Sequence, residues 1–278
     1  MRALRLPSFT SGWVQRPAWL RAFLFALAGC AVVYLLNLAL APVGAGTLLG
    51  RTYGALATVL MVAAAALAAR RRAVRRLPGR AQTWVQLHVY GGALALVLTL
   101  MHAGFRWPRE RLTWWLLLLS LWVTVSGLIG VALRKWIPRL LTSALRTEVI
   151  YERIPDLVAD VRQRCEALAA AGSPPLQEFY RQSVAPRLER PRVRWIYFVD
   201  ITGGIQARIK DFEFVRVLLA APERERLAEL ESLFATKLEL DAHYTLQKPL
   251  RWWLYAHVPV SYVLLLLIAI HLFAVLFY

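Results

Sequence analysis

Cysteine and acidic side chains are scarce in this 278-residue sequence. The two cysteines, Cys30 and Cys165, form no C-x-x-C motif and no cluster, which excludes an iron–sulfur centre held by this chain. We expect Cys30 in a membrane span and Cys165 in a soluble segment. A disulfide between them is therefore not expected.

Acidic residues are almost confined to one part of the chain. Residues 137–250 contain 17 of the 34 basic residues and 16 of the 17 acidic ones, and Glu110 is the only acid elsewhere. The formal charge of +17 therefore comes from basic residues that flank apolar segments. This distribution is a signal of membrane topology, and it argues against nucleic acid as a partner.

Apolar residues are abundant and occur in long runs. They make up 58% of the chain, and the mean hydropathy is +0.47. Five runs predict membrane spans at residues 19–41, 53–69, 84–104, 113–134 and 252–277, the second being short and rich in alanine. The first run resembles a signal peptide but is long for one, so we interpret it as a retained helix.

The predicted fold is an all-α polytopic membrane helical bundle of about five helices, with a small α+β lobe between helices four and five. Its domains are residues 1–136, the soluble lobe 137–250, and residues 251–278. Thirteen basic residues flank one side of the spans and four flank the other: Arg51, Arg106, Arg109 and Arg111. The positive-inside rule then predicts an integral protein of a bacterial-type inner membrane, with the N-terminus and the lobe cytoplasmic and the C-terminus at the outer face.

The lobe shows mixed local patterns. Residues 145–171 and about 175–184 are typical of helices, and a further helix is expected to begin near Pro222. The apolar run 195–199 followed by Gly203 and Gly204 predicts a β-hairpin. The two glycines indicate a turn, because the G-x-G-x-x-G fingerprint of dinucleotide-binding folds is missing.

Four of the five histidines form a doubled pattern. His88 and His102 are 14 residues apart, and so are His257 and His271. In a helix this interval is about 21 Å of rise and returns to within about 40° of the same face. The spans that carry the two pairs, the third and the fifth, are parallel, so His88 is level with His257 and His102 with His271.

Imidazoles inside a membrane need partners, and two haems would provide them. We predict an inner haem iron held by His88 and His257 and an outer one held by His102 and His271. Gly91 and Gly92 would leave room for a flat macrocycle, and SGLIG, residues 126–130, gives span four a small face for close helix approach. Candidate partners of haem propionates are Arg80, Arg134 and Arg251 inside and Arg106 and Arg109 outside.

Other interpretations of these residues stay open. A single membrane histidine is usually a hydrogen-bonded packing residue, and the arginines first of all determine topology. The 21 Å rise, at about 1.5 Å per residue, excludes one zinc or copper ion on all four histidines. The fifth histidine, His243, is expected to be a surface residue. Covalent haem attachment is excluded because the sequence has no C-x-x-C-H motif.

The doubled H-x13-H pattern resembles the dihaem membrane cytochromes b. Its placement on spans three and five is most similar to the ferric-reductase-type transmembrane domain, and cytochrome b of the bc complexes has the same spacing. The resemblance covers spans three to five and implies two stacked b-haems. Unlike many ferric reductases, this sequence shows no flavin or NADPH module.

The expected function is transmembrane electron transfer by a cytochrome b subunit of an oxidoreductase complex. A cytoplasmic redox protein would dock on residues 137–250, and the outer haem would exchange electrons with quinone or a periplasmic carrier; other membrane subunits are expected. One alternative is a metal or oxygen reductase with a separate donor chain and an outer pocket near Arg106, Trp107, Arg109 and Glu110. Another is a scaffold subunit without a cofactor.

Overall fold

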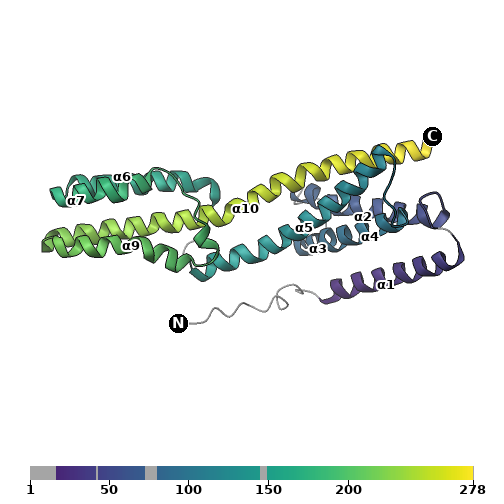
Figure 1. Ribbon diagram of the computed structural model, residues 1–278, viewed down its shortest axis with the longest axis horizontal. Helices are drawn as coiled ribbons and strands as arrows, with labels where there is room; N and C mark the ends of the chain where they lie inside the picture. The colour runs from purple at the N-terminus through teal and green to yellow at the C-terminus, as the bar shows by residue number, and fades with distance from the viewer. Residues whose placement is uncertain (1–16, 42, 73–79, 145–148, 278) are drawn as a thin grey trace. The chain divides into compact units, whose positions relative to one another are not determined.

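The described part of the chain is helical throughout. The computed structural model describes residues 17–41, 43–72, 80–144 and 149–277, and within these ranges it contains no strand. The α-helices are α1 (Pro17–Leu40), α2 (Leu48–Arg72), α3 (Ala81–Gln86), α4 (Gly92–His102), α5 (Arg111–Ala144), α6 (Ile154–Ala170), α7 (Pro174–Phe179), α8 (Ala185–Leu188), α9 (Ile201–Leu218) and α10 (Ala221–Phe277) (Figure 1). Two π-helical turns, η1 (Leu87–Gly91) and η3 (Tyr180–Val184), and two 3₁₀ turns, η2 (Tyr151–Arg153) and η4 (Trp195–Phe198), join some of them.

Five helices are long and apolar enough to cross a membrane, as the sequence predicts. They are Pro17–Leu40, Leu48–Ala68, Ala81–His102, Arg111–Leu141 and the apolar part of Ala221–Phe277. The chain is thus an integral membrane protein. The second span, which is short in the sequence pattern, belongs to a full-length helix. Much of the predicted basic side, residues 1–16 and 73–79, lies outside the described residues.

The chain forms two compact units. One comprises the residues up to Val131 and from Leu254 onward, and the other is Ala132–Trp253. We call the first the membrane unit and the second the lobe. Two long helices, α5 and α10, each contribute one part to the membrane unit and the other to the lobe.

Small and aliphatic residues pack the membrane unit. One core joins Tyr34 of α1 and Tyr53 of α2 to Leu98 and Met101 of α4. A second joins α2, α4 and α10 through Met61, Ala95 and Leu264, with residues of α5 against it. The two cores together tie all five apolar helices into one bundle.

Tryptophans mark two levels on α5. Trp115 and Trp136 are 49% and 47% exposed, and they lie about 31 Å apart along the helix. This matches the hydrocarbon thickness of about 30 Å, and tryptophan concentrates at both membrane–water interfaces. Near Trp115, the rings of Trp107 and Trp114 also contact each other, with centres 6.2 Å apart. This stretch of α5 has the length of a membrane span, and a further exposed tryptophan, Trp122, lies between its two ends.

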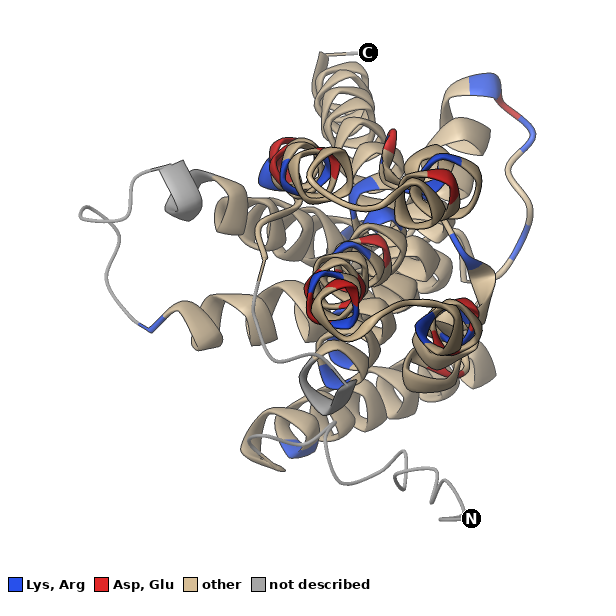
Figure 2. Ribbon diagram, turned by 90° about the vertical axis from the view of Figure 1, so that its left-hand side faces the viewer, with Lys and Arg blue, Asp and Glu red and all other residues tan. Residues whose placement is uncertain are grey.

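Helices build the lobe around its own apolar core. Residues from α6, α9 and α10 dominate this core, including Val158, Phe212 and Phe234. Acidic and basic residues are mixed on the lobe helices that face the viewer in Figure 2. Every ion pair found among the described residues lies within the lobe, and most of these pairs are exposed. These eight pairs neutralise half of the 16 acidic side chains of residues 137–250.

The predicted hairpin, and with it the α+β character of the lobe, is wrong. Residues 195–198 form the turn η4, and α9 begins at Ile201. The Asp200 carboxylate accepts a hydrogen bond of 2.8 Å from the Gly203 N–H, so Asp200 caps α9 and the glycines lie in its first turn. Ile205, Ile209 and Phe212 then recur at helical spacing and pack against the lobe core.

The other predicted lobe helices begin or end elsewhere. The helix expected over 145–171 is α6, which begins at Ile154 after η2, and residues 145–148 lie outside the described residues. The piece expected at 175–184 is split between α7 and η3. The helix expected near Pro222 begins at Ala221 and continues without a break into the fifth span.

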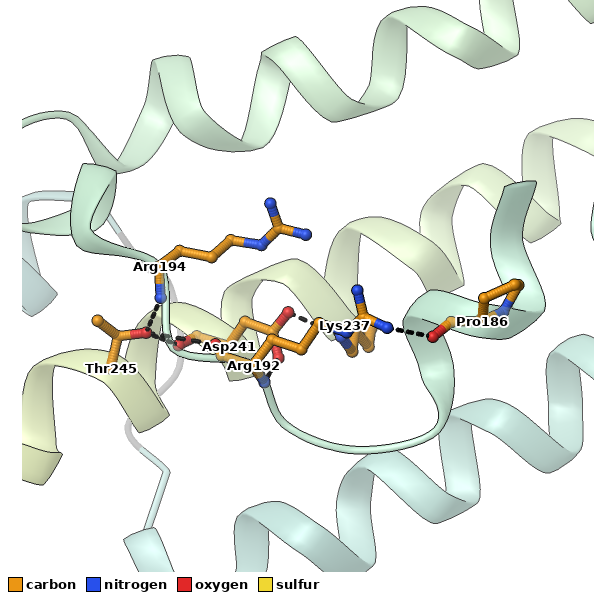
Figure 3. A network of polar contacts seen from close by, with 6 residues as sticks. All are labelled: Pro186, Arg192, Arg194, Lys237, Asp241 and Thr245. Atoms are coloured by element: carbon orange, nitrogen blue, oxygen red, sulfur yellow. Dashed lines mark hydrogen bonds and ion pairs between the residues drawn. The ribbon is translucent and has the colours of Figure 1, made fainter. Parts of the chain in front are cut away.

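An ion pair is fully buried in the lobe. Lys237 Nζ donates to Asp241 Oδ2 at 2.7 Å, and both side chains are 0% exposed. Asp241 Oδ1 accepts from the Arg192 N–H at 2.8 Å, and Thr245 donates to the Asp241 carbonyl (Figure 3). Burial lowers the pKa of Lys237 and raises the pKa of Asp241, and each partner's charge opposes the other's shift.

Candidate functional site: two histidine pairs

The structure brings His88 and His257 together in the membrane unit. Their ring centres are 6.2 Å apart, and the ring planes lie at 76°. His257 is 6% exposed, and His88 is partly buried. The two residues come from η1 and α10, which are separated in sequence by the whole lobe. Only the packing of the bundle makes this pair.

His102 and His271 form a second pair of the same geometry. Their ring centres are 6.5 Å apart, again with planes at 76°. His102 is the last residue of α4, and His271 lies near the end of α10. The structure therefore places side by side the two pairs that the sequence predicts, His88 with His257 and His102 with His271.

The separation within each pair suits one metal ion between two imidazoles. Metal–imidazole bonds are about 2.0–2.1 Å long and the bound nitrogen lies about 1.1 Å from its ring centre, so two trans ligands have centres about 6.3 Å apart. The observed values of 6.2 and 6.5 Å lie on either side of this distance. Imidazole planes at a large angle are compatible with such an axis, because both planes contain it.

Backbone carbonyls orient two of the four rings. His88 Nδ1 lies 3.0 Å from the Ala64 carbonyl oxygen, and His102 Nδ1 lies 2.8 Å from the Gly50 carbonyl oxygen. A carbonyl oxygen only accepts, so each Nδ1 carries the proton. The lone pair of each neutral ring is then on Nε2, which is the nitrogen that would bind a metal.

A hydroxyl orients the third ring in the same sense. Ser126 Oγ donates to the Val123 carbonyl at 3.2 Å and lies 2.8 Å from His257 Nδ1. In the arrangement in which the hydroxyl donates to Val123, its oxygen accepts from His257 Nδ1–H, and both rings of the pair carry their protons on Nδ1. Two imidazoles in that arrangement have no Nε2 proton to share, so a cation between them would satisfy both lone pairs.

A π-helical turn carries His88. The segment Leu87–Gly91 inserts one wider turn between α3 and α4. Such turns change the direction of the side chains that follow them and occur often at functional sites. The sequence pattern, which assumes a regular helix, contains no signal for it.

Gly54 and Gly127 lie beside two of the rings, and the role of Gly91 and Gly92 in leaving room for a macrocycle stays a prediction. A Cβ on Gly92 would meet nothing within 4 Å, and one on Gly91 would make only ordinary contacts. A Cβ on Gly54 would come within 2.8 Å of His102 Nδ1, and one on Gly127 within 3.4 Å of His257 Cε1. Gly54 and Gly127 therefore allow their helices to lie against the rings. Gly127 belongs to the predicted SGLIG face, whereas no sequence signal singles out Gly54.

The role of the five predicted arginines as propionate partners stays a prediction, and the structure gives their local surroundings. Arg80 is exposed just before α3, Arg106 is exposed in the turn after α4, and Arg109 follows in the same connection. Arg134 is exposed on α5, in the lobe. Arg251 pairs with Glu152 at 2.5 Å and lies 4.6 Å from the Tyr151 ring centre, so it stabilises the lobe.

His243 is not a surface residue, contrary to expectation. It is 4% exposed, and its Nδ1 lies 3.4 Å from Gln247 Nε2, one turn further along α10. The prediction failed because the charged pattern of the lobe hides the apolar face of this helix. His243 belongs to the core of the lobe and to neither pair.

No three-ligand metal site accompanies the pairs. Over the ranges the structure describes, no group of three or more His, Cys, Asp or Glu side chains is arranged to hold a metal ion. Each pair offers two protein ligands, whereas a zinc site needs at least three. Two axial imidazoles suit a metal whose other ligands come from a macrocycle.

Comparison of the chain with known protein families, with curated proteins and with solved structures finds no match.

Proposed function

We propose that the chain is a dihaem membrane cytochrome b, an electron-transfer subunit that holds two stacked bis-histidine b-haems. His88 and His257 would bind the inner haem iron, and His102 and His271 the outer one. The observation that carries this proposal is the ring-centre separation of 6.2 and 6.5 Å in two pairs. The resemblance of the doubled spacing to the ferric-reductase-type domain points to the same cofactor.

The residues around the rings fit this group. A b-type haem with two axial imidazoles supplies one-electron transfer at an iron without an open site. The chain's part would be to orient three of the four imidazoles through Ala64, Gly50 and Ser126 on the Nδ1 side.

Two haems at levels about 21 Å apart along the helices would form a path across the bilayer. The basic flanks favour an orientation with the lobe in the cytoplasm and the C-terminus at the outer face. In that orientation a cytoplasmic redox protein would dock on the lobe, and quinone or a periplasmic carrier would meet the outer haem. Further membrane subunits would complete the oxidoreductase complex.

The reductase and scaffold alternatives gain less support. Trp107 lies against Trp114 at 6.2 Å and is 57% exposed, as in a membrane-interface loop. Nothing in this loop favours a substrate pocket over that interpretation. A scaffold without a cofactor gives no reason for two imidazole pairs at metal-binding separation.

Haem content tests the proposal. The purified chain should give reduced-minus-oxidised b-type spectra and, by pyridine haemochrome assay, two haems per chain. The variants His88→Ala and His257→Ala should each lose one haem, and the same one, identified by its midpoint potential. His243→Gln is the matched control and should keep both. A haem-free native protein would refute the proposal, and loss of different haems by the two variants would refute the pairing.

A further inference from the structure

The turn η4 exposes apolar side chains beside a buried anchor. Trp195 is 78% exposed, Ile196 50% and Val199 73%, whereas Tyr197 is 0% exposed. Tyr197 therefore holds the turn in the lobe while its neighbours point outward. Large apolar side chains so close together in water are unfavourable, and they mark interaction sites.

Packing within the lobe places η4 against the parts of α5 and α10 that adjoin the membrane spans. Tyr197 belongs to a core with Ile137 of α5, and Leu133 and Leu250 pack against the same core. Phe198 lies between two tryptophans, with ring centres 6.0 Å from Trp136 and 5.6 Å from Trp195. The aromatic rings thus run from α5 directly to the exposed turn.

The candidate membrane span of α5 ends near this core. It covers Arg111–Leu141, so Trp136 and Ile137 lie close to its end. Trp252, at the start of the last apolar run, is 67% exposed. Exposed tryptophans on α5, η4 and α10 form the kind of aromatic belt that membrane proteins place among lipid headgroups.

Basic side chains accompany the belt. The segment 190–199, RPRVRWIYFV, contains three arginines and no acid. Arg134 and Arg139 of α5 are exposed next to the same core. Arginines beside exposed aromatic residues are typical of segments that bind anionic lipid surfaces.

We propose that η4 is an interfacial anchor of the lobe, with the bilayer surface as its partner. Trp195, Ile196 and Val199 insert at the boundary between headgroups and acyl chains, and the exposed Arg190 binds lipid phosphates. The inference depends on the membrane spans and is independent of haem. It gives the lobe a second attachment to the membrane in addition to α5 and α10.

Spin-label depth measurements on the full-length protein in lipid nanodiscs test the anchor. Labels are placed by Trp195→Cys and Val199→Cys in a Cys30→Ala background. Burial raises the pKa of the Cys165 thiol to about 12, so it does not compete for the label. The matched control is Val217→Cys, an apolar lobe residue that is 80% exposed and lies about 24 Å from Ile201 along α9.

We expect the ratio of oxygen to water-soluble nickel accessibility at 195 and 199 to be about three-fold higher than at 217, as for insertion of about 5–10 Å. Adding phosphatidylglycerol to phosphatidylcholine should raise this ratio further, and Arg190→Gln should reduce that increase. Equal ratios at 195, 199 and 217 in both lipids would overturn the proposal and leave this face to a protein partner. Because two positions are labelled, misfolding of one variant leaves the other as the test.

Discussion

The membrane unit and the lobe satisfy their buried polar groups in different ways. In the lobe, the Lys237 ammonium and the Asp241 carboxylate bind each other, and the Arg192 N–H completes the set. In the membrane unit, backbone carbonyls accept from Nδ1 of His88 and His102, which leaves Nε2 as the lone-pair nitrogen, and the Ser126 hydroxyl lies 2.8 Å from His257 Nδ1. The buried groups of the lobe are thus satisfied by one another. The paired imidazoles, with ring centres 6.2 and 6.5 Å apart, are spaced to suit a bound cation.

The largest effect is expected when one partner of the buried Lys237–Asp241 ion pair is removed. Asp241→Ala leaves the Lys237 ammonium buried without its counter-ion and should destabilise the lobe by about 3–5 kcal/mol. Thermal unfolding of the detergent-solubilised protein measures this loss. Lys237→Met combined with Asp241→Leu removes both charges and should cost much less. Equal destabilisation by the single and the double variant would contradict this account of the pair.

The outer histidine pair is sensitive to the volume beside His102. Gly54→Val adds atoms at a position where even a Cβ would come within 2.8 Å of His102 Nδ1, so the ring must move. We expect loss of one haem and about 1–3 kcal/mol of stability. Haem content and midpoint titration measure the first effect. Gly29→Ala in α1, where a Cβ would meet nothing within 4 Å, is the control and should keep both haems.

The Ser126 hydroxyl helps to orient His257 in the inner pair. Ser126→Ala deletes this hydroxyl, which lies 2.8 Å from His257 Nδ1, and should weaken metal binding about 10–100-fold at the inner site alone. Haem retention during dilution and the potential of each haem distinguish the two sites. Ser126→Thr keeps the hydroxyl and should restore the native values. A change confined to the haem that is lost in the His102 and His271 variants would contradict the contact between Ser126 and the inner site.

The smallest effect is expected at Arg251. Its partner Glu152 is 65% exposed, so Arg251→Gln should cost about 0–1 kcal/mol by thermal unfolding. Because Arg251 is engaged within the lobe, both haems should keep their spectra and potentials. A large shift in the potential of the inner haem would instead support the role in binding propionates that the sequence suggests.

The sequence predicts the membrane spans well because each span is a long, uniform run of apolar residues. Apolar runs predicted all five spans, because crossing the membrane requires about 20 apolar residues whatever surrounds them. The lobe was harder to predict because its short segments carry signals for more than one structure. Val199 and its neighbours suit a strand, yet the Asp200 cap and the packing of Ile205 and Ile209 favour a helix.

The candidate site divides in the same way. The spacing of 14 residues alone singled out His88, His102, His257 and His271, because helix periodicity is a local property. Three other features exist only when distant helices pack together. They are the separation of the rings across the bundle, the contacts of the rings with the carbonyls of Ala64 and Gly50, and the close approach of Gly54 to His102. The sequence by itself determined that the chain crosses a membrane with paired imidazoles. The tertiary structure decided how far apart the rings stand and which nitrogen each presents, because both depend on contacts between residues far apart in the chain.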